Sequence, residues 1–129
     1  MRKTIAFDFD GVIHKYSKGW QDGSIYDTID FELLNFMKEL LKNYNIVIYS
    51  TRDPEQITNY LNELGVMKFE TFNSTFWDKE NVVGVTNTKP AAILYIDDRA
   101  FEYIPGFSTD LNIAMIKIKL EIGEMKWNQ

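Results

Sequence analysis

The sequence predicts an α/β fold built on a mainly parallel sheet. Three short and almost wholly apolar segments, at residues 4–9, 46–49 and 91–96, have the composition of strands that are covered on both faces. Two segments with helical periodicity lie between them, at residues 31–43 and 54–64. Strands that alternate with helices are typical of βαβ units, in which the strands run parallel.

Both helical segments carry boundary signals. In the first, apolar residues recur at three- and four-residue spacing, and Asp27, Thr28 and Asp30 are all candidate N-caps. In the second, Asp53 is the expected N-cap, a proline takes the first helical position, and Gly65 stands where a C-terminal cap belongs. The sequence therefore predicts where each helix begins better than where the first one ends.

The remaining segments give weaker signals. Residues 66–72 and 82–85 are expected to hold short strands, and residues 15–27, rich in glycine, serine and polar side chains, are expected to form a loop or flap. The tail at residues 111–125 fits either the apolar face of a helix or an alternating strand, and we favour the helix.

Length and composition limit the possible functions. The chain has 129 residues, 45% of them hydrophobic, and we expect one domain spanning residues 1–129. The formal net charge of −5 argues against a general nucleic-acid binder, which would normally be basic. With no cysteine and one histidine, disulfides and Cys/His zinc sites are excluded. No membrane span or signal peptide is expected, so we predict a soluble cytoplasmic protein.

Polar side chains follow each of the three apolar strands. In parallel sheets, ligands bind beyond the carboxyl ends of the strands, so these side chains are expected to meet at one edge. They are Asp8 and Asp10 after the first strand, Ser50 and Thr51 after the second, and Asp97 and Asp98 after the third.

This set of residues favours phosphoryl chemistry. Carboxylates placed so close together repel one another unless a cation neutralises them, and Mg²⁺ takes oxygen ligands and completes its shell with water and phosphate. Lys89, just upstream of the third strand, can reach the same edge, and Ser50 and Thr51 add hydroxyl and backbone donors. A metal, a lysine and a hydroxyl that face one point can position and stabilise a phosphoryl group. An aspartate can also act as nucleophile in such a site.

The order of these residues resembles the four motifs of the haloacid dehalogenase-like (HAD) hydrolases. The Asp-x-Asp-Gly-(Thr/Val) motif of that superfamily resembles residues 8–12, Asp-Phe-Asp-Gly-Val. The strand that ends in Ser or Thr resembles residues 46–50, the isolated lysine resembles Lys89, and the strand that ends in an acidic pair resembles residues 93–98. The first motif is fairly specific, and the order of all four carries the resemblance.

The resemblance implies a role for both carboxylates of the first motif. Asp8 would be the nucleophile that forms an aspartyl-phosphate intermediate, and it would also bind Mg²⁺. Asp10 would protonate the leaving group and then deprotonate the hydrolytic water, with its backbone carbonyl on the metal.

The resemblance also assigns the phosphate and metal ligands. Ser50, with Thr51 beside it, would bind the transferring phosphoryl group, and Lys89 would bind phosphate and offset the charge of the nucleophile. Asp98 is expected to be the direct metal ligand and Asp97 to lie in the outer shell, although the two could exchange roles.

The chain departs from the larger members of the superfamily, which carry a cap domain. We therefore expect a Rossmann-like three-layer domain with no large cap, in which the flap at 15–27, the segment at 73–88 or a partner selects the substrate. A small-molecule phosphate ester is the favoured substrate. A nucleotide or a nucleic-acid end is the alternative, and the negative net charge weakens the polymer version.

Two other functions fit part of the pattern. A receiver domain also uses an acidic pair, a Ser or Thr and a Lys at strand ends, but its phosphorylated Asp sits mid-chain, where this chain has Ser50. A phosphatase fold that serves only as a binding or assembly module is opposed by the intact catalytic set.

Other residues near the motifs have structural explanations. His14 is expected to be a flap residue near the rim of the site, and Arg52 is expected to pair with an acidic neighbour. Tyr16 and Trp20 are expected to pack the flap down, although either could stack on a base or sugar. Lys79 is the second candidate for the phosphate-binding lysine.

Overall fold

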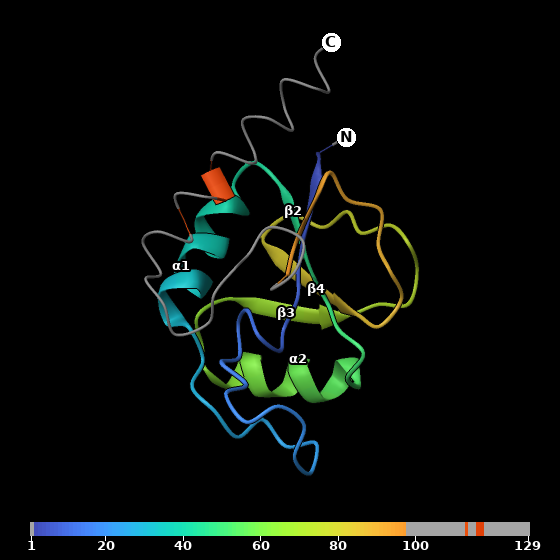
Figure 1. Cartoon of the computed structure of the whole chain (residues 1–129). Helices are drawn as coiled ribbons and strands as arrows, with labels where there is room; N and C mark the ends of the chain where they lie inside the picture. The colour runs from blue at the N-terminus through green and yellow to red at the C-terminus, as the bar shows by residue number, and fades with distance from the viewer. Residues whose placement is uncertain (1, 98–112, 114–115, 118–129) are drawn as a thin grey trace.

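The computed structural model describes residues 2–97, 113, 116 and 117, and they contain a five-stranded parallel sheet (Figure 1). The strand order is β3-β4-β2-β1-β5, so the first strand of the chain lies inside the sheet. This confirms the predicted α/β class with a parallel sheet. The strands are β1 (Thr4–Phe7), β2 (Asn45–Tyr49), β3 (Lys68–Thr71), β4 (Val82–Thr86) and β5 (Leu94–Ile96).

Two helices link the first three strands: α1 (Phe31–Leu40) and α2 (Pro54–Glu63). In Figure 1, α1 lies beside β2, and α2 packs against β3 and β4. Of the three candidate N-caps for α1, Asp30 is the one whose carboxylate accepts from the N–H of Leu33, at 3.0 Å. Asp53 caps α2 as predicted, since its carboxylate accepts from the N–H of Glu55 at 3.1 Å.

The core lies between the sheet and the helices. The inner strands β1 and β2 are buried along almost their whole length, which explains why they are apolar on both faces. α1 presents an apolar stripe toward β2, and α2 presents one toward β3 and β4. Most polar residues of both helices lie outside, although Thr58 of α2 is buried. The largest fully buried side chains include Phe7, Phe9, Met37, Ile46, Ile48, Ile57 and Phe69.

Close packing explains why position 84 in β4 is a glycine. A Cβ built on Gly84 would lie 2.6 Å from Cδ2 of Trp77 and 2.7 Å from Cε1 of Phe72. The two rings are tilted by 35° with their centroids 4.8 Å apart, and they cover the strand at this point. Only glycine leaves the backbone of β4 open to such a close approach.

Three of the predicted elements were longer than those in the structure. The strand predicted over 91–96 begins at Leu94, because the N–H of Ala91 donates to the carbonyl of Thr75 outside the sheet. The first strand ends at Phe7, because the carbonyl of Phe9 accepts from a following turn. The predicted helix at 31–43 ends at Leu40, and turns follow it.

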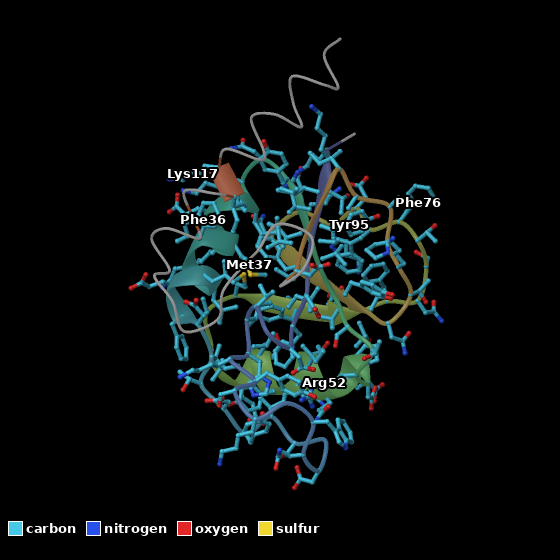
Figure 2. All side chains as sticks on the ribbon, in the orientation of Figure 1. Phe36, Met37, Arg52, Phe76, Tyr95 and Lys117 are labelled. Carbon is cyan, nitrogen blue, oxygen red and sulfur yellow. The ribbon has the colours of Figure 1, made fainter. Side chains whose placement is uncertain are left out.

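The predicted C-terminal helix at 111–125 lies mostly outside the described residues. Residues 113, 116 and 117 are helical, Ile116 is buried in the core, and the ammonium of Lys117 lies 5.8 Å from the ring centroid of Phe36 (Figure 2). Across the described part of the chain, no helix has the length and apolar character needed to cross a membrane.

Candidate functional site

The carboxyl ends of three neighbouring strands meet at one edge of the sheet. Phe7 at the end of β1 pairs with Ile48 of β2 on one side and with Ile96 of β5 on the other. Asp8 and Asp97 therefore follow paired residues, and the N–H of Asp8 donates to the carbonyl of Ile96 at 2.9 Å. The register of the sheet thus places these two carboxylate-bearing residues side by side.

A cavity of about 690 Å³ opens at this edge. Six of the seven residues that sequence analysis proposed line it, and they come from four separate places in the chain. These six are Asp8, Asp10, Ser50, Thr51, Lys89 and Asp97, and the other lining residues are Ala6, Phe7, Tyr16, Tyr49, Tyr95 and Ile96. Asp98, the seventh, lies outside the described residues.

Ser50 is buried at the end of β2, and its hydroxyl has one fixed partner. The N–H of Arg52 donates to Ser50 Oγ at 3.2 Å, so the hydroxyl hydrogen can still point at a ligand. The N–H of Ser50 donates to the carbonyl of Thr86 at 3.1 Å, which fixes the backbone at this point. Thr51, the next residue, is exposed at the mouth of the cavity.

Lys89 reaches the cavity from the loop between β4 and β5. Its ammonium lies 5.0 Å from the centroid of the Tyr95 ring, within the range of a cation–π contact. The Tyr95 hydroxyl donates to the carbonyl of Pro90 at 2.5 Å, and this bond ties the ring back to the same loop. The lysine therefore lies over the Tyr95 ring, and both residues line the cavity.

Asp10 is held from two sides after a tight turn. Gly11 follows it with φ +85, a conformation that favours glycine and lets the chain leave the end of β1 at once. Arg52 Nε donates to Asp10 Oδ2 at 2.7 Å, and His14 Nδ1 lies 2.8 Å from Asp10 Oδ1. Both carboxylate oxygens thus have a nitrogen partner, and Arg52 pairs with an acidic neighbour as predicted.

His14 lies beside the cavity, in contact with Asp10, and is more deeply buried than its place after the first motif suggested. Its side chain is fully buried, and its ring stacks on Phe9 with the centroids 5.4 Å apart. The N–H of Asp27 donates to His14 Nε2 at 3.0 Å, so Nε2 carries no proton and Nδ1 is assigned the hydrogen that points to Asp10. His14 thus lies between the cavity residue Asp10 and the flap residue Asp27, and its burial is the feature that the sequence did not predict.

The flap at 15–27 folds back over this site. Tyr16 adopts the left-handed conformation at φ +57, which is rare for a bulky residue, and lines the cavity. Loss of hydration and the nearby Asp10 carboxylate raise the pKa of Tyr16 above its ordinary value. Tyr16 packs the flap down as predicted, whereas Trp20 is 70% exposed.

Two tyrosines that line the cavity were not predicted from the sequence. Tyr49 is the last residue of β2 and Tyr95 lies in the middle of β5, so both were assigned to apolar strands. The available signal was their hydroxyl groups, because a tyrosine close to the polar end of a buried strand needs a polar partner or water.

The carboxylates of the cavity are the candidate ligands for a divalent metal. Within residues 2–97, 113, 116 and 117, no group of three or more His, Asp or Glu side chains is close enough to hold one. Asp8 and Asp97, which line the cavity side by side, supply the oxygen donors that suit Mg²⁺. Mg²⁺ commonly uses one or two carboxylates with water and phosphate as its other ligands, so the two residues fit this ion.

Comparisons with protein-family models, with curated proteins and with solved structures found no significant match. The likeness to HAD hydrolases therefore stands on the motifs and on the placement of their residues around one cavity.

Proposed function

We propose that this protein is a Mg²⁺-dependent phosphohydrolase, a HAD-like phosphatase that cleaves a phosphomonoester through an aspartyl-phosphate intermediate on Asp8. The observation that carries the proposal is the shared cavity. Asp8, Ser50 and Lys89 come from three different parts of the chain, and all of them line it. A nucleophile, a hydroxyl donor and a cation around one point are the groups that phosphoryl transfer needs.

The reaction would run in two steps. In the first, a carboxylate oxygen of Asp8 attacks phosphorus, the bond from phosphorus to the ester oxygen breaks, and Asp10 gives that oxygen a proton. In the second, Asp10 removes a proton from water, which attacks the same phosphorus and releases inorganic phosphate and free Asp8. Ser50 and Lys89 would bind the phosphoryl oxygens throughout.

The donors around Asp10 hold the carboxylate that the proposal assigns as acid and base. Arg52 and His14 contact different oxygens of its carboxylate, so the side chain has one preferred orientation. A fixed orientation lowers the entropic cost of each proton transfer, because the carboxylate need not search for the ester oxygen or the water.

Asp8 and the backbone carbonyl of Asp10 would hold the metal together with the acidic pair after β5. Within that pair, Asp98 is the direct ligand expected from the sequence and Asp97 the outer-shell residue, although the two could exchange roles. When bound there, Mg²⁺ would supply positive charge that offsets the carboxylates and the charge of the phosphate. Among the described residues Lys89 would add to this effect, since it is a cationic residue that lines the same cavity.

A nucleotidase is the second candidate, and the tyrosines favour it over a phosphatase for small aliphatic esters. Tyr16, Tyr49 and Tyr95 line a cavity far larger than a phosphate group needs. Aromatic side chains stack on a base at about 1–3 kcal/mol each, so a nucleoside monophosphate could gain affinity from these walls. An oligonucleotide end would be disfavoured by the negative net charge of −5.

The test is a substrate panel in the presence of Mg²⁺. Nucleoside monophosphates, sugar phosphates and 5′- and 3′-phosphorylated oligonucleotides would be compared by phosphate release, with chelated samples and the Asp8→Asn variant as controls. We expect Mg²⁺-dependent turnover that both controls abolish. No release from any substrate, or release that Asp8→Asn leaves unchanged, would refute the proposal. We expect the activity to be cytoplasmic.

A further inference from the structure

Arg52 connects two parts of the site that are distant in sequence. From one side of the guanidinium, Nε donates to Asp10 Oδ2 at 2.7 Å. From the other, Nη1 donates to the carbonyl of Gly23 at 2.6 Å and Nη2 to the carbonyl of Ser24 at 3.4 Å. Figure 2 shows Arg52 where the start of α2 meets the loop that carries these two carbonyls. One planar group therefore contacts the proposed acid/base residue and the flap.

The guanidinium is enclosed as well as bonded. The Arg52 side chain is 6% exposed, and its Cζ lies 5.9 Å from the ring centroid of Phe9 and 5.8 Å from that of Tyr16. Gln56 completes the arrangement, since its amide donates to the same carbonyl of Gly23 at 2.7 Å. Because the N–H groups of the guanidinium already have acceptors and the group is enclosed, Arg52 is not placed to bind a phosphate itself.

We propose that Arg52 is a positioning residue that couples the closed position of the flap (residues 15–27) to the orientation of Asp10. This inference rests on the proposed function for the role of Asp10. With the flap closed, the two carbonyls fix the plane of the guanidinium, and that plane fixes Asp10 Oδ2. When the flap lifts, the guanidinium loses these acceptors, and the carboxylate loses a rigid partner.

Tyr16 makes the flap responsive to the contents of the cavity. It belongs to the flap, lines the cavity and covers one face of the guanidinium, so a molecule in the cavity contacts the flap through this ring. The left-handed backbone of Tyr16 is a conformation that persists only when surrounding contacts impose it. Substrate binding, flap closure and the placement of Asp10 are thereby joined through Arg52.

The coupling can be tested without any enzyme assay, because it must act in both directions. Trypsin cuts after Lys15 and Lys18, which lie in the flap, and after Lys68, which lies in the sheet. Asp10→Ala removes the carboxylate partner of Arg52, and Asp8→Ala makes the same change two residues earlier. We expect Asp10→Ala to raise the ratio of flap cleavage to Lys68 cleavage about tenfold over Asp8→Ala and the wild type.

The ratio separates local loosening from global unfolding, since unfolding would raise cleavage at all three lysines together. If Asp10→Ala does not fold, Asp10→Asn keeps the shape of the side chain and removes its charge, and a rise of the same sign is expected. Equal ratios in the Asp10 and Asp8 variants would overturn the coupling.

The second arm measures catalysis with a substrate found in the panel above. Arg52→Gln is expected to lower kcat about 10²-fold, the loss typical of a misplaced catalytic group, while KM changes little. Arg52→Lys should recover part of kcat because an ammonium can still reach Asp10. Lys42→Gln, which removes one charge from an exposed pair, is the control and should match the wild type. A kcat of Arg52→Gln equal to that of the wild type would overturn the positioning role.

The two arms distinguish the failure of this inference from the failure of the proposed function. If the wild type hydrolyses no phosphate ester, the proposed function falls, and the cleavage ratio of Arg52→Gln still decides the coupling, because this variant leaves the His14 contacts to Asp10 and Asp27 in place. A rise in its flap cleavage over that of the wild type supports the link through Arg52, and an unchanged ratio overturns it.

Discussion

His14 Nδ1 lies 2.8 Å from Asp10 Oδ1, and the same imidazole accepts the backbone N–H of Asp27 at Nε2. A single buried ring therefore connects the carboxylate after β1 to the end of the flap. The hydrogen bond from Asp27 determines which nitrogen carries the proton, and this in turn makes His14 a donor to Asp10.

The two nitrogens of His14 can be tested separately. In His14→Asn an amide takes the place of Nδ1 and can donate to Asp10, whereas in His14→Gln it takes the place of Nε2 and can accept from Asp27. Each variant leaves one partly buried polar group without its partner, so we expect each to lower the free energy of unfolding by about 1–3 kcal/mol. Because the contact to Asp10 serves catalysis, kcat should be higher in His14→Asn than in His14→Gln. Urea unfolding and steady-state kinetics measure both effects, and the reverse order of kcat would contradict this assignment.

The lysine assigned to phosphate binding can be checked against Lys79, the other candidate. Lys79 donates to Glu70 at 2.8 Å and lies over Trp77, whereas Lys89 lines the cavity. We expect Lys89→Gln to lower kcat/KM by about 10²–10³-fold, the usual loss when one charge-stabilising donor is removed. Lys79→Gln should retain the wild-type value. Equal losses in the two variants would show that the lysine in the cavity has no special role.

The contacts of Asp27 are expected to stabilise the folded protein less in acid. The hydroxyl and N–H of Ser17 and the N–H of Thr28 donate to its carboxylate, and they hold the pKa of Asp27 well below its ordinary value of 3.8. A pKa that is lower in the folded protein means that the contribution is fully present above pH 3.8 and is lost as the pH falls toward the folded value.

The measurement is the difference in unfolding free energy between the wild type and Asp27→Asn across this range. We expect the difference to be constant near neutral pH and to shrink in acid. A difference that does not change with pH would show that the Ser17 contacts are absent in solution. Ser24→Ala, which removes a hydroxyl that donates to Asp22 in the same flap, should give a second difference that shrinks in acid, because that hydrogen bond lowers the pKa of Asp22.

A side chain at position 84 should overpack the Trp77 ring, and a smaller residue in place of Trp77 should relieve this. An added Cβ would lie 2.6 Å from the Trp77 ring, so Gly84→Ala should lower the free energy of unfolding by about 1–3 kcal/mol through overpacking. Trp77→Leu removes part of the ring that the methyl group meets. The double variant should therefore lose less than the sum of the two single losses. Strictly additive losses would contradict the contact.

Much of the fold could be predicted because the signals were local. Asp53, the proline after it and Gly65 mark the two ends of α2, and Gly65 has φ +71 as a helix-ending glycine requires. The strand starting at Leu94 was predicted too long, because the bond between Ala91 and Thr75 depends on a loop that is distant in sequence. Strand order also depends on such distant contacts and could not be obtained from periodicity.

The site was predictable for the residues that end strands and not for those that support them. Asp8, Ser50 and Asp97 follow apolar strands, so the geometry of a parallel sheet brings them together. The buried position of His14 and the links of Arg52 to Gly23 arise from how the flap folds back, and no local pattern encodes that.

The central claim is that Asp8 carries the phosphoryl group, and trapping the acyl phosphate tests it most directly. A reaction with Mg²⁺ and an active phosphomonoester would be stopped by acid within one turnover and treated with borohydride, which reduces an acyl phosphate to the alcohol. Peptide mass spectrometry then locates the modified residue. We predict that Asp8 is converted to homoserine in the wild type and that Asp8→Asn shows no conversion. Conversion at Asp10 or Asp97 instead, or turnover without any modified aspartate, would contradict the mechanism.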